Sequence, residues 1–374
     1  MAQEWFFLVA LAGFITGIVL TKRFPHYSEG DFRVLFILLV FLALTKGLEE
    51  SGLLKWIAAK VEKGSYPTLK LVLTTFVLSM VVTNDVALLT VVPLSLHLSR
   101  VNVANLVILE ALAANAGSAL TPIGNPQNIF LYHFYELEPI TFVKTILPFS
   151  IFFLVLILLL VPKERTAPGE TVEKTLKVDW KTAITLLLFF VLFIPCALRF
   201  LPVWLGVLPL LYLLFFRRET LLKVDYFLLA TFFFFFGFTD NVSHLLGFKL
   251  ENPDGVFLYA ALISQILSNV PTALLMADFT HQWKALLWGV NVGGFGTLIA
   301  SLANLIAYKL YSARYGAKRE FLIKFHLVGL LFLFLGIALY FVLYSNWVSP
   351  VVGEIFSTLK VAIGFLITAF KAVI

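Results

Sequence analysis

The sequence predicts an all-α integral membrane protein with about 10 transmembrane helices and two re-entrant hairpins, in two inverted-topology repeats with broken helices. Three observations predict this fold class. Sixty per cent of the 374 residues are hydrophobic and only 13% are charged, whereas a soluble domain is roughly a quarter charged. Long apolar runs recur along the chain, and four of them have polar centres. Those four form two matching pairs.

The charge and the cysteine content limit which partners and which kinds of site the chain can have. The net charge of +6 comes from basic residues in short loops between apolar runs, so we expect a lipid bilayer as partner and no nucleic acid. The single cysteine, Cys196, excludes an internal disulfide and a cysteine metal cluster. No phosphate-binding loop followed by Lys-Ser/Thr is present, which argues against ATP-driven transport by this chain.

Uninterrupted apolar runs predict the simple membrane spans. A helix needs about 20 apolar residues to cross a bilayer core. The first run has no basic segment before it and no small-residue cleavage site after it, so we expect a retained helix. Residues 351–373 form either a further membrane helix or an amphipathic segment at the membrane surface. The predicted spans are 4–20, 32–48, 140–161, 182–197, 200–216, 226–240 and 325–345.

Two further apolar runs predict re-entrant hairpins. Residues 68–98 are interrupted by Thr83-Asn84-Asp85, and residues 255–279 by Ser268-Asn269-Val270-Pro271. Each arm has about 14 residues and therefore spans about 21 Å as a helix, which is too short to cross. A helix–turn–helix that enters and leaves on one side resolves this problem.

The other two interrupted runs predict broken membrane helices. Residues 103–134 have the polar centre 115–128, and residues 283–310 have the polar centre 291–304. Gly and Pro at this density unwind a helix. The freed backbone groups require polar partners, so such breaks are expected to face protein or a polar cavity.

The interrupted elements repeat along the chain. Asn84 of the first hairpin matches Asn269 of the second, and Asp31 matches Asp225 at an offset of 194. We therefore predict a first repeat over 1–197, which contains the loop 162–181, and a second over 198–374. In the broken helices, Asn115, Gly117, Thr121, Ile123 and Asn128 match Asn291, Gly293, Thr297, Ile299 and Asn304 at an offset of 176.

The distribution of basic residues predicts the orientation. Eighteen Lys and Arg residues fall in the loops on the side of the N-terminus and seven on the other side. This bias predicts a multi-pass protein of the cell membrane with a cytoplasmic N-terminus. Inverted repeats with paired broken helices indicate alternating access to a site at the membrane midplane.

The polar breaks form the predicted binding site. Their amides, hydroxyls and freed carbonyls suit Na⁺, with Thr83, Asn84, Asp85, Gly117 and Ser118 as its candidate ligands. The N-termini of the second hairpin arms, near Asp85 and Val270, present N–H groups to an anion. The remaining candidate substrate or ion ligands are Asn115, Thr121, Asn125, Asn128, Ser268, Asn269, Thr272, Asn291, Gly293, Gly294, Thr297, Ser301 and Asn304.

Asp85 is the most informative single residue. An acid at membrane depth is costly and indicates a cation ligand or a proton carrier. The alternative is an N-cap for the second hairpin arm, because Asp is a favoured capping residue. Since only the first pair of breaks contains an acid, we expect the second half to contribute a neutral share of the cavity.

The motifs Thr83-Asn84-Asp85, 117–128, 268–272 and 293–297 resemble those of the ion transporter superfamily with a citrate-transporter-like domain. Arsenical permeases, sodium/proton antiporters and divalent-anion/sodium symporters belong to it. The dicarboxylate branch carries Ser-Asn-Thr at both hairpin tips, so an acid at Asp85 is more similar to the arsenical permease and antiporter branches. Relatives often dimerise, so the resemblance also implies a homodimer as one possible state.

Residues and resemblance together predict a secondary active transporter, not an enzyme. We expect it to move an inorganic ion or small anion by alternating access, coupled to Na⁺ or H⁺, with no other cofactor. One alternative is a sodium/proton antiporter with Asp85 as the exchanging group. Another is a sodium-coupled dicarboxylate or citrate symporter.

Overall fold

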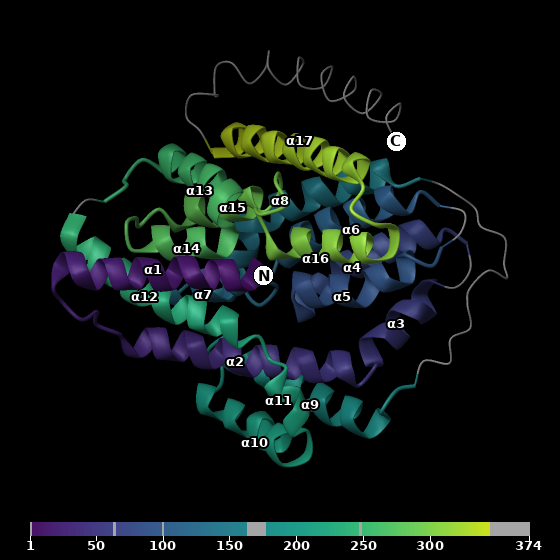
Figure 1. The fold of residues 1–374 in the computed structure, drawn as a ribbon, viewed down its shortest axis with the longest axis horizontal. Helices are drawn as coiled ribbons and strands as arrows, with labels where there is room; N and C mark the ends of the chain where they lie inside the picture. Colours follow the sequence, from purple (N-terminus) through teal and green to yellow (C-terminus); the bar gives the residue numbers. More distant parts are fainter. Residues whose placement is uncertain (1, 63–64, 99–100, 163–176, 247–248, 345–374) are drawn as a thin grey trace.

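The computed structural model describes residues 2–62, 65–98, 101–162, 177–246 and 249–344. All regular elements within these ranges are helical (Figure 1). The predicted segment 351–373 and most of the predicted loop 162–181 lie outside the described residues.

The first half of the chain follows the predicted apolar runs closely. The hairpin 68–98 forms two helices, α4 and α5, and the broken helix 103–134 forms α6 and α7. The elements are α1 (Ala2–Thr21), α2 (Glu29–Glu50), α3 (Leu53–Glu62), α4 (Pro67–Val82), α5 (Asn84–Ser95), α6 (Val103–Ser118), α7 (Pro126–Phe134), α8 (Pro139–Leu160) and α9 (Trp180–Ala197).

The second half repeats the two divided runs as α13–α14 and α15–α16. The run 200–216 is helical only from Val203. A 3-10 turn begins there, directly after Pro202, and leads into α10. The elements are η1 (Val203–Gly206), α10 (Val207–Phe216), α11 (Arg218–Leu222), α12 (Tyr226–Leu246), α13 (Pro253–Leu267), α14 (Asn269–Ala277), α15 (Trp283–Gly293), α16 (Leu302–Tyr315) and α17 (Arg319–Tyr344).

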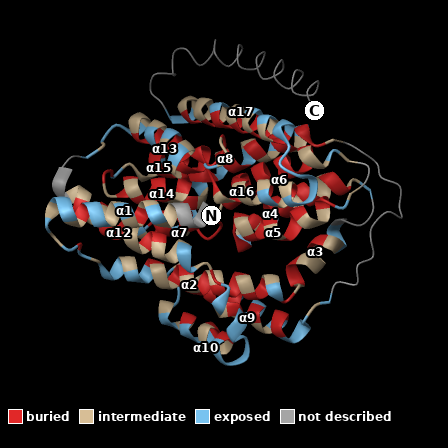
Figure 2. Ribbon diagram, viewed as in Figure 1, coloured by how far each residue is buried: buried red, intermediate tan, exposed pale blue. Residues whose placement is uncertain are grey.

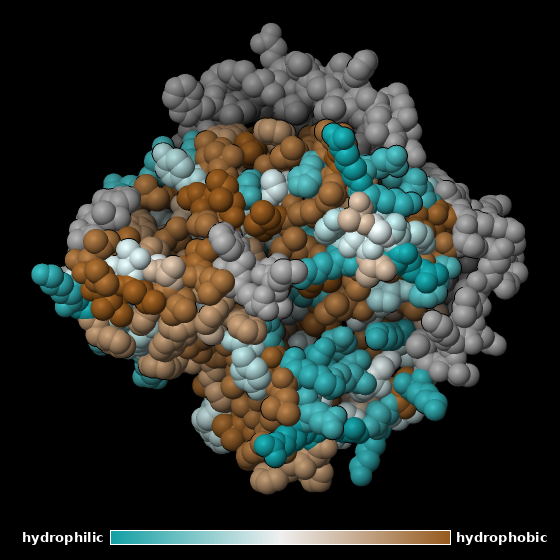
Figure 3. Space-filling view, in the orientation of Figure 1, coloured by the Kyte–Doolittle hydropathy of each residue, from teal (hydrophilic) through white to brown (hydrophobic). Residues whose placement is uncertain are grey.

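Length and apolar composition identify this as an all-α membrane protein. Among the described helices, α8, α9, α17 and the first 18 residues of α12 are long and apolar enough to cross a bilayer. Large apolar side chains on them point outward, including Leu188 at 66% and Phe334 at 64% exposed. Apolar residues also cover much of the face over α1 and α13 (Figure 3). Such a surface is suited to lipid. The number of crossings and the inverted orientation of the repeats stay predictions.

The divided helices occupy the middle of the molecule. Buried residues concentrate there, while α1, α10 and α17 lie at the periphery (Figure 2). Helix α4 packs on α6, α13 packs on α15, α5 packs on α16, and α7 packs on α14. The last two contacts join the first half of the chain to the second. Parts of both halves therefore meet at the centre.

Two glycines of the repeated motifs allow close helix contacts. A Cβ on Gly117 of α6 would overlap the Phe76 carbonyl and the Ser79 hydroxyl of α4. A Cβ on Gly293 of α15 would lie 2.7 Å from the Ser264 hydroxyl of α13. Small residues at such positions let membrane helices pack backbone to backbone.

Replacing Gly117 with alanine is expected to lower the melting temperature of the purified protein strongly. The added methyl group meets backbone, which cannot rotate away, and overpacking of this kind costs about 1–3 kcal/mol. Gly255→Ala is the matched control, because its nearest neighbour would be an ordinary 3.7 Å away. Thermal unfolding in detergent compares the two variants. Equal melting temperatures for them would contradict the close contact of α4 and α6.

Candidate functional site

Thr83 and Ser268 divide the two predicted hairpins. Thr83 has φ +82° between α4 and α5, and Ser268 has φ +74° between α13 and α14. Positive φ is unusual for any residue but glycine, and most of all for a β-branched one. The predicted interruptions of three and four residues are too long: Asn84 and Asp85 already belong to α5, and residues 269–271 already belong to α14, so each hairpin is divided at a single residue.

Each of these breaks is fixed to the neighbouring broken helix. The Asn84 backbone N–H donates to the Gly124 carbonyl at 3.2 Å, and the Asn269 N–H donates to the Ala300 carbonyl at 2.9 Å. Both acceptors lie in the non-helical stretches, between α6 and α7 and between α15 and α16. The four breaks therefore meet in two pairs.

Asn128 and Asn304 satisfy the carbonyls that unwinding frees. The Asn128 amide donates to the carbonyls of Ser118, Ala119 and Thr121 at 3.1–3.3 Å. The Asn304 amide donates to the carbonyls of Gly294 and Thr297 at 3.0 Å. Because a buried carbonyl without a partner is costly, these two amides stabilise the unwound stretches.

Buried asparagines join the two halves of the chain. Asn115 donates to the Asn304 side chain at 2.8 Å, and Asn291 donates to the Asn128 side chain at 3.1 Å. Asn115 also accepts from Ser301 at 3.0 Å, and Asn291 accepts from Asn125 at 3.5 Å. These four bonds form two pairs that are related by the repeat offset of 176. The matched asparagines therefore occupy corresponding places in one network.

The remaining predicted residues pack around this network. Thr121 and Thr297 donate to the carbonyls of Met80 and Gln265 at 2.5 and 3.0 Å, which ties each unwound stretch to its neighbouring hairpin. Ser118 accepts from Asn125 at 3.2 Å, and Thr272 donates to the Ser268 carbonyl at 2.7 Å. These side chains bond to protein rather than to the pocket.

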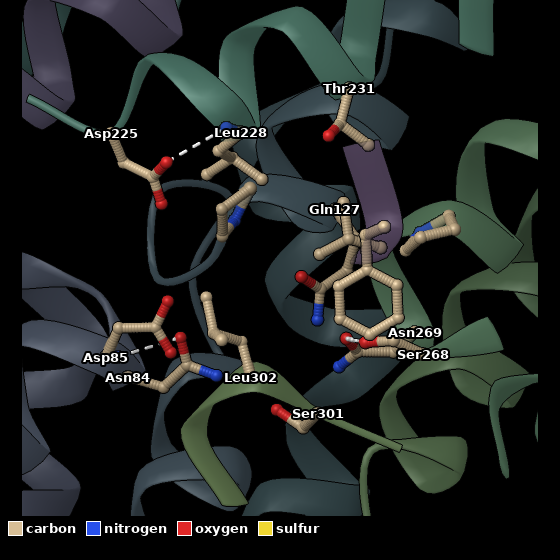
Figure 4. Close-up of a pocket in the computed structure, with 14 residues that line it drawn as sticks. Asn84, Asp85, Gln127, Asp225, Leu228, Thr231, Ser268, Asn269, Ser301 and Leu302 are labelled. Carbon is tan, nitrogen blue, oxygen red and sulfur yellow. Dashed lines mark hydrogen bonds between the residues drawn. The ribbon is translucent and has the colours of Figure 1, made fainter. Parts of the chain in front are cut away.

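A pocket adjoins the network, because its lining residues Asn84 and Ser301 both donate to the Asn115 side chain. It spans about 510 Å³ of space between atoms, part of which is open solvent, and its lining residues come from both halves of the chain (Figure 4). Five predicted residues line it: Asn84, Asp85, Ser268, Asn269 and Ser301. The lining residues that the sequence did not predict as ligands are Phe6, Pro126, Gln127, Asp225, Leu228, Thr231, Val270, Pro271 and Leu302.

Two carboxylates give the pocket its charge. Asp85 and Asp225 both line it, and the described lining residues include no Lys, Arg or His. The Oδ1 atom of Asp85 is buried without a hydrogen-bond partner in the described structure, whereas Oδ1 of Asp225 accepts from the Leu228 N–H at 3.0 Å. The lining residues from the second pair of breaks carry no charge, and the second acid of the pocket, Asp225, comes from the segment just before α12.

Asp225 could have been found from the sequence. It was matched to Asp31 as a marker of the repeat, but Asp31 serves as part of a capping box with Ser28 at the start of α2. The first half therefore has no counterpart of Asp225 in the pocket. Gln127 lies inside the polar centre 115–128, between the predicted ligands Asn125 and Asn128. The polar interruption that predicted those two ligands therefore also indicates Gln127.

Four helix N-termini converge on the pocket. The helices α5, α7, α14 and α16 begin at Asn84, Pro126, Asn269 and Leu302, and all four residues line it. Helix N-termini carry partial positive charge and unpaired N–H groups. Asn125 caps α7 through the Asn128 N–H, but α5, α14 and α16 have no side-chain bond from their N-cap residues. The N–H groups of Asn84, Asp85, Asn269 and Asn304 already donate within the protein, so a ligand would bind to the other N–H groups of these first turns.

The chain is similar to known membrane proteins. Residues 5–288 match the family described as citrate transporter. The chain is 34% identical to an uncharacterized transporter of Methanocaldococcus jannaschii, over 78% of this chain and 85% of the relative. It is 35% identical to the inner membrane protein YbiR of Escherichia coli, over 76% of this chain and 81% of the relative. A 46 kDa membrane protein of Mycobacterium leprae is 25% identical, over 77% and 80%.

Proposed function

The chain belongs to the citrate transporter family, and from that premise we propose that it is a secondary active transporter that binds a small anion together with a coupling cation, H⁺ or Na⁺. Both bind in the pocket between the divided helices. The cation binds at Asp85, and the anion binds at the helix N-termini. Alternating access of this pocket to the two sides of the cell membrane completes the cycle.

One observation carries the proposal: four helix N-termini and two carboxylates share one pocket. Each N-terminus is equivalent to roughly +0.5 charge, so four of them offset about two negative charges. With both acids ionised, little net attraction remains for an anion. When a proton or Na⁺ neutralises Asp85, the N-termini favour anion binding. The cation and the anion then bind together, which is what symport requires.

The anion itself is argued from chemistry and from the family. Citrate is the cargo in the family's name, so it is the first anion to test, followed by dicarboxylates and small inorganic anions. The acid at Asp85 disfavours an anion bound without its cation, so we expect little citrate binding when the coupling cation is absent.

Sodium/proton antiport is the second candidate. It is favoured by the unpartnered Oδ1 of Asp85 and by the lack of basic side chains among the described lining residues. In this case H⁺ and Na⁺ compete for Asp85, and the helix N-termini only tune its proton affinity. No anion then enters the pocket.

Proteoliposomes separate the two functions. We expect uptake of radiolabelled citrate, a dicarboxylate or an inorganic anion when an inward H⁺ or Na⁺ gradient is imposed, and loss of that uptake when an ionophore collapses the gradient. Antiport would instead appear as Na⁺-driven proton movement without any anion. If neither flux is observed in vesicles whose protein is shown to be folded, that result would contradict a cation-coupled transporter.

A further inference from the structure

A second acid lies within the helix core, away from the pocket. Glu110 of α6 is 0% exposed and is not among the residues that line the pocket. Its Oε1 accepts a hydrogen bond from the Ser95 hydroxyl of α5. Its Oε2 is buried without a hydrogen-bond partner in the described structure. Neither the repeat pattern nor the predicted site included this residue.

The charge state of Glu110 follows from these surroundings. A buried carboxylate with one neutral hydrogen bond and no cation costs several kcal/mol, whereas the protonated acid avoids most of that cost. The described ion pairs do not include Glu110. Because Oε1 is the acceptor for Ser95, the proton is placed on Oε2.

Among the described ion pairs, no titratable group on the helices that pack against α6 supplies a positive charge to neutralise Glu110 in place of that proton. Asp85 at the start of α5 lies in the pocket and carries the same sign of charge. Among the described residues, the Ser95 hydroxyl is the side chain that bonds to Glu110. The remaining charged or titratable groups on those helices are Lys70 of α4, Lys144 of α8, Tyr308, Lys309, Tyr311, Arg314 and Tyr315 of α16, and Arg319, Glu320, Lys324, His326, Tyr340 and Tyr344 of α17.

Helix α5 connects this acid to both the pocket and the surface. Asp85 is in its first turn and Ser95 is its last residue, ten residues apart and so about 15 Å along the axis. Two residues beyond Ser95, His97 is exposed. Glu110 therefore contacts the end of α5 that approaches the surface, and Asp85 occupies the end that faces the pocket.

We propose that Glu110 is a proton-binding site whose proton on Oε2 exchanges with solvent past the Ser95 end of α5. Exchange breaks and reforms only the carboxyl O–H bond, with water as the proton acceptor and donor. The inference deepens the proposed function, since such a site would supply protons for use at Asp85. Its occupancy and exchange are nevertheless measurable without any cargo.

Infrared difference spectroscopy of the purified protein tests both properties. The Asp85→Asn background removes the signal of one pocket acid, and the other, Asp225, is present in every variant compared and so cancels in the difference. In that background at neutral pH we expect a protonated carboxyl band that disappears in Glu110→Gln and is retained, shifted, in Glu110→Asp. Transfer to heavy water is expected to shift the band, and to shift it more slowly when Ser95→Ala is added.

Two results would overturn the inference. If Glu110→Gln removes no carboxyl band while Glu110→Asp and the parent give identical spectra, then Glu110 is ionised. If the band is present but does not shift in heavy water, its proton is buried and not exchangeable. A band that shifts as expected in a protein without transport activity would support the proton site while refuting the proposed function.

Discussion

Replacing Asp85 with asparagine is expected to abolish the coupling between cation and anion. Asparagine has nearly the shape of aspartate but no charge to neutralise, so the four helix N-termini attract the anion whether or not a cation is present. Typical coupling between two ligands is 1–3 kcal/mol, which corresponds to roughly 5- to 150-fold in affinity. We expect the cation to raise anion affinity by that factor in the native protein and to have no effect in the variant.

Binding measured at several pH values and Na⁺ concentrations checks this result. The anion probe is citrate, or whichever anion the proteoliposome assay identifies. Gradient-driven accumulation in proteoliposomes is expected to be lost in Asp85→Asn, while exchange of anion for anion continues. Glu251→Gln is the matched control, because it also neutralises one acid but lies in an exposed segment outside the pocket.

The same variant distinguishes coupling from helix capping. Asp85 is in the first turn of α5, where an acid stabilises a helix by about 0.3–1 kcal/mol through its dipole. If Asp85 has only that role, Asp85→Asn lowers the melting temperature slightly and leaves the cation dependence of binding unchanged. That outcome would remove Asp85 from the transport mechanism and leave Asp225 as the pocket acid to test.

The sequence predicted the helices well because hydrophobicity and helix-breaking residues act locally. Apolar runs marked the helices, and Gly and Pro marked the unwound stretches before Pro126 and after Gly293. The single-residue breaks at Thr83 and Ser268 could not be located in the same way, since neither residue type favours positive φ. Their conformation is fixed by distant contacts to Gly124 and Ala300.

The residues that line the pocket were less predictable from the sequence than the asparagine network that adjoins it. The recurrence of asparagines at one offset picked out residues that the structure joins across the halves, Asn115 to Asn304 and Asn291 to Asn128, because a repeated structure places repeated residues in equivalent positions. The pocket lining depends instead on which segments converge from distant parts of the chain. Asp225 reaches it from outside the repeated breaks. Glu110 was overlooked inside an apolar run, although an isolated acid at that depth is itself a signal.

The asparagine network leads to the second large effect, which is on stability. Replacing Asn128 with leucine, which has a similar size, is expected to destabilise the protein severely. The carbonyls of Ser118, Ala119 and Thr121 and the amide of Asn291 would lose a partner. Each buried group left unsatisfied costs roughly 1–3 kcal/mol, so a total of about 4 kcal/mol or more is expected.

Two further leucine substitutions show whether that loss is specific to the network. Asn304→Leu is expected to act almost as strongly, because its amide also holds two freed carbonyls and it accepts from Asn115. Asn105→Leu is expected to leave stability unchanged or raise it by about 1 kcal/mol, because both amide atoms of Asn105 are buried without partners in the described structure. Thermal unfolding in detergent ranks the three variants. If Asn128→Leu and Asn105→Leu melt at the same temperature, the bonds that join the two halves contribute nothing beyond the burial of an amide.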